Sequence, residues 1–111
     1  MLHAMARVHV LSDDLLFGSR LQAELSAAGH AVTIGPHAEG SAELLVVDLT
    51  HDAPARLAQL DTTRPTIAFY SHVEADVREQ ALAAGIDLAV PRSRMAREPV
   101  ALVARMLATE R

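Results

Sequence analysis

Acidic residues follow two apolar runs that predict buried strands, and they are the clearest candidates for chemistry in this chain. Asp48 directly follows the run Leu44–Val47, and Asp13 and Asp14 come shortly after Arg7–Leu11. Partly exposed oxygen ligands suit Mg²⁺, which binds one or two carboxylates together with phosphate oxygens. Three carboxylates brought together repel one another unless a cation intervenes. The acidic set therefore indicates a magnesium site that also accommodates a phosphoryl group.

Two further apolar runs are followed by polar side chains that fit the same chemistry. Ser71 comes directly after Thr66–Tyr70, and Arg92 follows Leu88–Val90 with Pro91 between them. A hydroxyl and a guanidinium would hold phosphoryl oxygens that a metal ion leaves free. We therefore add Ser71 and Arg92 to the candidate site.

Each candidate except Asp48 also has a purely structural explanation. Asp13 or Asp14 would cap a following helix. Ser71 would open a capping box with Glu74, and Arg92 belongs to a basic run typical of a solvated face. Asp48 stands neither at a helix start nor in a turn. The joint pattern is more specific than any member, because independent caps would not all fall at the carboxyl ends of strands.

The apolar patterning predicts the elements that would position these side chains. The expected strands are Arg7–Leu11, His30–Ile34, Leu44–Asp48, Thr66–Tyr70 and Leu88–Val90. The first helix is expected from Leu15 to Ala28. Two more are expected to start after the caps Asp52 and Ser71 and to end at Leu60 and Ala84, respectively. The last is expected from Glu98 to Thr109 and would bury Val100, Val103 and Leu107, with Met106 beside them. The connection Pro36–Ala42 is too short and too rich in helix breakers for more than one turn.

This alternation predicts the fold class. Strands alternating with helices imply a parallel sheet with right-handed crossovers and helices on both faces. We expect an α/β, flavodoxin-like, doubly wound sheet of five strands in the order 2-1-3-4-5, with the second helix shortened or missing and residues 1–111 forming one domain. The first and third strands are then neighbours, so Asp13, Asp14 and Asp48 would converge in one crevice.

Composition excludes several classes of function. The chain has 111 residues, a formal net charge of −4, 3% aromatic residues and no cysteine. Nucleic-acid binding relies on clustered cations and aromatic rings, and disulfides, thiol catalysis and Cys-based zinc sites all need cysteine. The histidines (His3, His9, His30, His37, His51 and His72) form no His-x₃-His pair, which leaves zinc weakly supported. No signal peptide or membrane-spanning run is present, so a cytoplasmic location is expected.

With these residues in place, the chain resembles the receiver domain of two-component response regulators. The resemblance runs from Arg7 to Arg111 and is carried by four segments in the family's order. They are the acidic pair in Val10–Asp14, the acceptor-like Leu45–Asp48, Ser71 after the fourth strand, and the Ala-rich helix end at Ala81–Ile86.

The resemblance implies a role for each acidic candidate. Asp48 would be the phosphoacceptor, and its carboxylate would attack the phosphorus of a phosphohistidine on a sensor histidine kinase. Asp13, Asp14 and Asp48 would hold Mg²⁺, with the backbone carbonyl of Thr50 as a further ligand. Ser71 would then move to a phosphoryl oxygen and shift the population of two surface conformations.

The sequence also departs from the family pattern. Arg92 stands where the family has an invariant lysine, and Pro91 precedes it rather than following it. Arginine keeps the charge but not the compact ammonium group. Leu88 or Ala89 takes the place of the aromatic switch residue on the fifth strand. These departures bear on phosphorylation-driven switching more than on the fold.

Two functions therefore stay open, and neither makes the chain an enzyme. One is a receiver-like domain that signals through a sensor histidine kinase or another signalling protein, with Mg²⁺-dependent phosphoryl acceptance at Asp48. The alternative is a pseudo-receiver without phosphorylation, which interacts or dimerises through the fifth strand and the last helices, where Arg92, Arg94 and Arg97 lie. A small hydrolase using Ser71 or Asp48 is disfavoured, because Ser71 lacks a Gly-x-Ser-x-Gly setting. Neither nucleic acid nor membrane is an expected partner.

Overall fold

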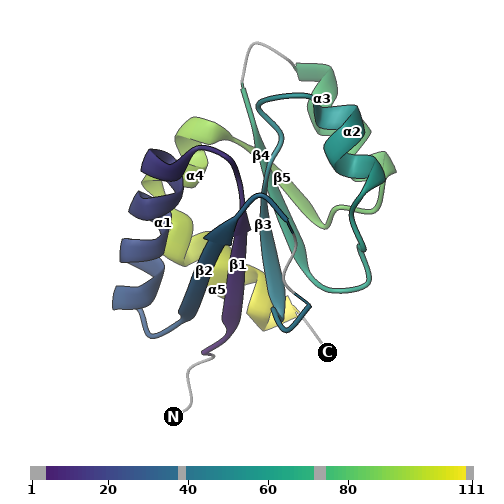
Figure 1. Cartoon of the computed structure of the whole chain (residues 1–111). Coiled ribbons are helices and arrows are strands. Elements are labelled where there is room, and N and C mark those ends of the chain that lie inside the picture. Colours follow the sequence, from purple (N-terminus) through teal and green to yellow (C-terminus); the bar gives the residue numbers. More distant parts are fainter. Residues whose placement is uncertain (1–4, 38–39, 72–74, 110–111) are drawn as a thin grey trace.

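The computed structural model describes residues 5–37, 40–71 and 75–109, and its strands form one parallel sheet in the order β2-β1-β3-β4-β5 (Figure 1). The elements are β1 (Arg7–Leu11), α1 (Leu15–Ala27), β2 (Ala31–Gly35), β3 (Leu44–Asp48), α2 (Ala53–Ala58), β4 (Thr66–Tyr70), α3 (Ala75–Ala83), β5 (Leu88–Pro91), α4 (Arg92–Arg97) and α5 (Pro99–Thr109). The predicted fold class and strand order are confirmed.

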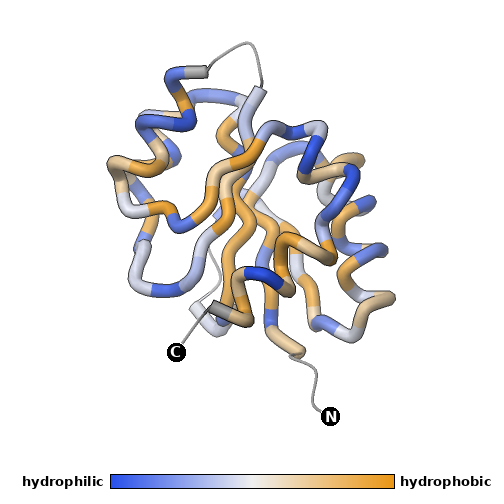
Figure 2. Tube along the Cα trace, turned by 180° about the vertical axis from the view of Figure 1, so that it is seen from behind, coloured by the Kyte–Doolittle hydropathy of each residue, from blue (hydrophilic) through white to orange (hydrophobic). Residues whose placement is uncertain are grey.

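The sheet separates two layers of helices. Helices α1, α4 and α5 contact one another on one face, and α2 and α3 contact each other on the opposite face (Figure 1). Every residue of β3 and β4 is buried, which explains their continuous apolar runs. Figure 2 shows the hydrophobic residues concentrated along these inner strands. No helix among the described residues is long and apolar enough to span a membrane.

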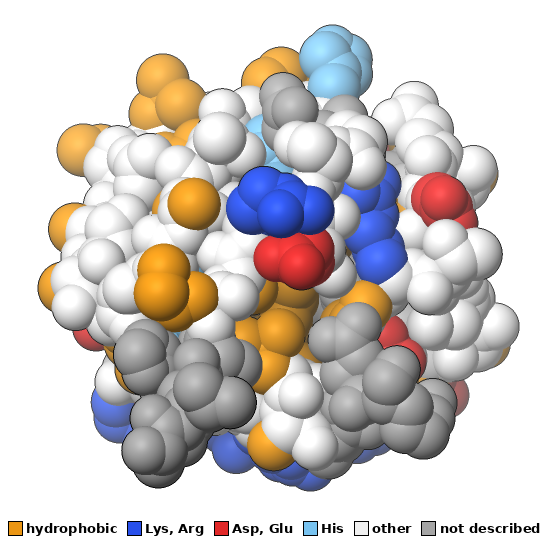
Figure 3. Space-filling model, turned by 90° about the horizontal axis from the view of Figure 1, so that it is seen from below, with side chains coloured by type: hydrophobic (Ala, Val, Ile, Leu, Met, Phe, Trp, Pro, Cys, Tyr) orange, Lys and Arg blue, Asp and Glu red, His pale blue; other side chains and the backbone are white. Residues whose placement is uncertain are grey.

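The connection from β2 to β3 contains no helix among its described residues, as its sequence predicts. β2 is an edge strand in the sheet order, and its residues are half-buried or exposed. Arg7 ties the connection down, because its Nε donates to the carbonyl of Ser41 at 2.8 Å and its guanidinium pairs with Glu43. The edge at which the strands begin thus carries basic and acidic side chains side by side (Figure 3).

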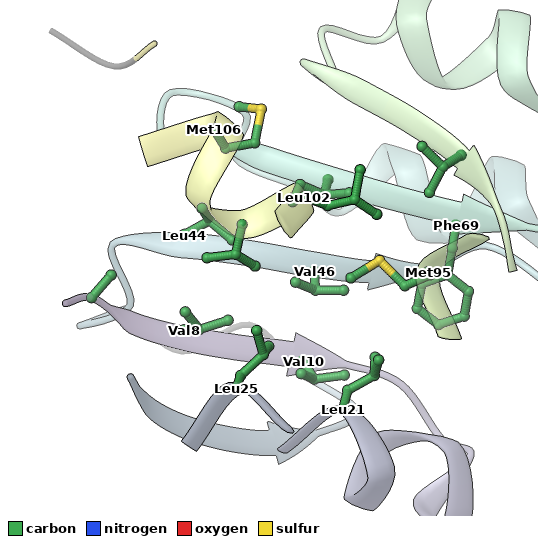
Figure 4. Close-up of a cluster of buried hydrophobic side chains, with 14 of the residues drawn as sticks. Val8, Val10, Leu21, Leu25, Leu44, Val46, Phe69, Met95, Leu102 and Met106 are labelled. Atoms are coloured by element: carbon green, nitrogen blue, oxygen red, sulfur yellow. The ribbon is translucent and has the colours of Figure 1, made fainter. Parts of the chain in front are cut away.

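The larger hydrophobic cluster fills the layer between the sheet and helices α1, α4 and α5. Figure 4 shows its side chains interdigitating from the strands and the helices. Leu21 and Leu25 of α1 are buried against Val8 and Val10 of β1, as the helical spacing predicts. Helix α1 begins at a true cap, because Asp14 Oδ1 accepts a hydrogen bond from the Phe17 N–H at 3.0 Å.

The carboxyl-terminal elements differ from expectation. Residues 92–97, for which no helix was expected, form the separate helix α4, and only Met95 is buried there. Helix α5 then begins at Pro99 and buries Leu102, Val103 and Met106, while Val100 is exposed. The expected stripe was therefore wrong at Val100. The proposed capping box of Ser71 and Glu74 falls partly outside the described residues.

Gly85 takes a backbone conformation that other residues rarely adopt. Its φ is +99°, and a Cβ there would lie 3.0 Å from Thr62 Oγ1. We expect Gly85→Ala to lower the free energy of unfolding by about 1–2 kcal/mol, measured by urea denaturation. Gly40→Ala is the matched control, because its Cβ would meet no atom within 4 Å. Equal effects of the two substitutions would contradict the role of the left-handed conformation.

Candidate functional site

Asp48 ends β3 and is held by hydrogen bonds from the chain itself. Its Oδ2 accepts from the Ser12 hydroxyl at 2.6 Å. Its Oδ1 accepts from the Thr50 N–H at 2.9 Å and the Thr50 hydroxyl at 2.5 Å. Only 6% of Asp48 is exposed to solvent. Burial of a carboxylate is tolerated when its oxygens are hydrogen-bonded in this way.

Ser12 is a site residue that was not among the candidates expected from the sequence. It follows β1 directly, is fully buried, and also accepts a hydrogen bond from the Asp14 N–H at 3.0 Å. The sequence could have indicated that Ser12 lies near Asp48, because β1 and β3 are neighbours and their carboxyl ends meet at one edge. The hydroxyl links the end of β1 to the end of β3.

Asp13 lies at the same edge but points outward. Its side chain is 72% exposed and pairs with Arg56 of α2, Nη2 to Oδ2, at 3.3 Å. The same guanidinium donates through Nη1 to the carbonyl of Leu11 at 3.1 Å and is only 15% exposed. Arg56 thus holds the β1–α1 turn and neutralises its first acid.

Asp14 is engaged twice. Besides capping α1 through Oδ1, it accepts from Arg92 Nη2 through Oδ2 at 2.9 Å. The guanidinium carbon of Arg92 lies 4.2 Å from the centre of the Phe17 ring, a cation–π distance. Phe17 in turn packs against Phe69, with ring centres 4.9 Å apart. Arg92 therefore connects the second acid to the hydrophobic core.

An open groove of about 600 Å³ lies at this end of the sheet. Its polar walls include Asp14, Arg20, Thr50, Ser71, Arg92 and Ser93. The structure thus brings together four of the predicted site residues, namely Asp14, Thr50, Ser71 and Arg92. Asp13 and Asp48 do not line this groove, since one faces outward and the other is buried.

The described acidic side chains at this edge lie too far apart, or are too fully engaged, to form a Mg²⁺ site as placed. Within residues 5–37, 40–71 and 75–109, no three histidine or acidic side chains lie close enough to hold a metal ion. The carboxylates of Asp13 and Asp14 are paired with arginines, and that of Asp48 is held by Ser12 and Thr50. The expected convergence of three carboxylates is thus not found in this arrangement, and these residues as placed do not fit the ion.

Comparisons with known proteins identify the fold. No protein-family model and no curated protein sequence matches the chain. Among solved structures, it is similar to NtrX from Brucella abortus, solved in complex with ADP, with a TM-score of 0.82 and 18% identity. It is also similar to the non-phosphorylated HemR receiver domain from Leptospira biflexa (TM-score 0.74, 18% identity) and to the ChxR receiver domain from Chlamydia trachomatis (TM-score 0.61, 12% identity).

These likenesses extend over nearly the whole chain. The matches cover 96%, 95% and 92% of it, respectively. They cover 96% of the HemR domain and 99% of the ChxR domain, but the chain spans only 27% of NtrX. The chain therefore has the fold of response regulator receiver domains. At these identities the likeness concerns the fold alone.

Proposed function

We propose that this receiver-fold chain is a signalling module that acts through protein–protein contacts and whose acidic site is closed by its own side chains. The observation that carries the proposal is that every candidate carboxylate is engaged within the chain: Asp13 by Arg56, Asp14 by Arg92, and Asp48 by Ser12 and Thr50. Such a site needs no metal ion to offset its charge. The module is then a pseudo-receiver and not an enzyme.

The proposed contact surface is formed by α4, β5 and α5. Arg94 and Arg97 both pair with Glu98, so these two cations share one acid. The surface is thus basic in a chain whose formal net charge is −4. Val100 of α5, part of the same surface, is 37% exposed and offers an apolar contact. This combination suits an acidic partner surface, whether on a sensor kinase, another signalling protein or a second copy of this chain.

A second candidate function is Mg²⁺-dependent phosphoryl acceptance at Asp48, with Asp13, Asp14 and the Thr50 carbonyl as further metal ligands. It is favoured by the position of Asp48 at the end of β3 and by the groove that Ser71 and Arg92 share beside it. When bound, Mg²⁺ would offset negative charge on a transferring phosphoryl group. For this function the arginine pairs must open first.

A titration distinguishes the two functions. We add Mg²⁺ and beryllium fluoride, a phosphoryl mimic, to the labelled chain and follow the backbone amide signals of Asp48, Thr50 and Ser71 by NMR. The pseudo-receiver predicts no shift that depends on both components, and no difference between the wild type and Asp48→Asn. Saturable shifts that require Mg²⁺ and vanish in Asp48→Asn would overturn it and support phosphoryl acceptance.

A further inference from the structure

The outer edge of β2 carries backbone groups that no strand pairs. The Ala31 N–H donates to the residue before β1, and the Gly35 carbonyl accepts from the residue after it, so both residues point their backbone groups toward β1. Because this direction alternates along a strand, Val32 and Ile34 point theirs outward. Among the described residues, only the Val32 carbonyl finds a partner on that side, Gln22 Nε2 of α1 at 2.9 Å.

The strand itself has none of the features that keep other strands away from an edge. Natural edge strands are commonly blunted by charged side chains, by proline or by a β-bulge. β2 contains no charged residue and no proline, and its register with β1 is continuous, so it has no bulge. Its three central residues, Val32, Thr33 and Ile34, are β-branched and favour an extended chain. β2 can therefore pair with a further strand.

The side of α1 beside this edge is uncharged. Helix and strand lie together at one end of the sheet (Figure 1). Gly18 and Gln22 face β2, since a Cβ on Gly18 would lie 3.1 Å from Ile34 and Gln22 makes the hydrogen bond described above. Leu15 and Ser26 fall on the same side of the helix, three residues before Gly18 and four after Gln22. No charge on this side of α1 therefore opposes a second α1 beside it.

Two exposed apolar side chains flank the two ends of β2. Leu15 is 66% exposed and lies near the end of the strand, one turn before Gly18. Met5 is 62% exposed and lies just ahead of the strand, its Cγ 3.6 Å from where a Cβ on Gly29 would be. An antiparallel copy related by a two-fold axis reverses these ends, so that Leu15 of each copy approaches Met5 of the other. A peptide from another protein would leave both exposed.

From these features we propose that two copies of this chain pair through antiparallel β2 strands. Thr33 lies opposite Thr33 of the second copy on the two-fold axis, a favourable cross-strand pair. Each Val32 exchanges N–H···O bonds with Ile34 of the second copy, and its carbonyl accepts this bond beside the one from Gln22 because it has two lone pairs.

This interface is separate from the surfaces discussed above. β2 and β5 are the opposite edges of the sheet, so the pairing leaves α4, β5 and α5 uncovered. It also makes no use of Asp48. The inference therefore stands whichever proposed function is correct.

Sedimentation equilibrium over a concentration series tests the pairing, and amide exchange followed by NMR locates it. We expect the mean mass to rise toward that of a dimer. Exchange at the Val32 and Ile34 amides should slow as the concentration rises, because these N–H groups gain acceptors. The Thr33 amide already points toward β1 and should change least. A dimer through α4, β5 and α5 would leave all three amides unprotected and would overturn the proposal.

Charge substitutions at the two apolar contacts test the register. Leu15→Lys and Met5→Glu should each weaken dimerisation at least about tenfold, because each puts a charge against an apolar side chain. The double variant places opposite charges together and should recover most of the affinity. Leu16→Lys is the matched control, since Leu16 is exposed on α1 but faces away from β2. All three residues are exposed, so the fold should be unaffected.

A backbone substitution tests the hydrogen bonds directly. Val32→Pro removes an N–H that points outward and leaves the pairing with β1 in place, as edge strands tolerate. It should abolish the dimer. The charge variants keep the test decisive if Val32→Pro fails to fold.

Three results would overturn the proposal. They are a chain that stays monomeric up to about 1 mM, a dimer without protection of Val32 and Ile34, and equal losses in Leu15→Lys and Leu16→Lys. A capped peptide copying residues 30–36 tests the other occupant. If it protects Val32 and Ile34 in a chain that does not dimerise, the edge takes a strand from a different protein and the second copy is ruled out.

Discussion

Replacing Asp48 by alanine should lower the free energy of unfolding by about 2–5 kcal/mol. The substitution leaves the Ser12 hydroxyl, which is fully buried, and the Thr50 N–H without their acceptor. A buried donor that loses its partner keeps the full cost of its desolvation. Urea denaturation measures the change, with an unchanged m-value as the sign that both states stay comparable.

Two variants control this experiment. Asp48→Asn retains one acceptor oxygen and should cost less than Asp48→Ala. Asp13→Ala removes a carboxylate that is 72% exposed, and its pair with Arg56 should be worth less than about 1 kcal/mol. A stabilised Asp48→Ala variant would mean that the carboxylate is held at a cost in stability, as is common where a side chain is kept for chemistry. That result would contradict the proposal that the acidic site is closed by the chain's own side chains.

The double substitution Arg56→Gln with Arg92→Gln should create a magnesium site. It frees Asp13 and Asp14 from partners at 3.3 and 2.9 Å. The freed carboxylates of Asp13 and Asp14 would lie at one edge of the sheet without their arginine partners, and this uncompensated negative charge favours the binding of a divalent cation. We expect Mg²⁺ to bind at least about tenfold more tightly than to the wild type, a gain of about 1.4 kcal/mol in calorimetry.

Arg94→Gln with Arg97→Gln is the matched control for this design. It removes the same formal charge from the chain, but these arginines pair with Glu98 and leave Asp13 and Asp14 engaged. Equal gains in both double variants would assign the effect to net charge alone. If the wild type already binds Mg²⁺ as tightly as the Arg56/Arg92 variant, the arginines do not close the site.

The sequence contained enough information to predict the sheet and the position of its chemistry. Continuous apolar runs at Leu44–Val47 and Thr66–Tyr70 indicate strands buried on both faces, and the structure confirms them. Because parallel strands end at one edge, residues that follow them were expected to lie close together. Thr50, Ser71 and Arg92 do line one groove at this edge.

The pairing of Asp13 and Asp14 with arginines could not be predicted from the sequence. Arg56 is 43 residues from Asp13, and Arg92 is 78 residues from Asp14. Such pairs depend on how helices pack and which rotamers they select, and neither follows from spacing along the chain. Helix α4 was missed for a related reason, since a six-residue helix that buries only Met95 has almost no apolar period.

The uncovered edge of the sheet determines where this domain is least protected. β2 borders only β1, its residues are half-buried or exposed, and the connection that follows it brings no helix among its described residues. β3, by contrast, is hydrogen-bonded on both sides and fully buried. We expect the chain to open in stages, with β2 exchanging its amide protons with solvent well before the central strands. Local opening is then easiest at the β2 edge, and Asp48, at the end of β3, lies in the part of the sheet that opens last.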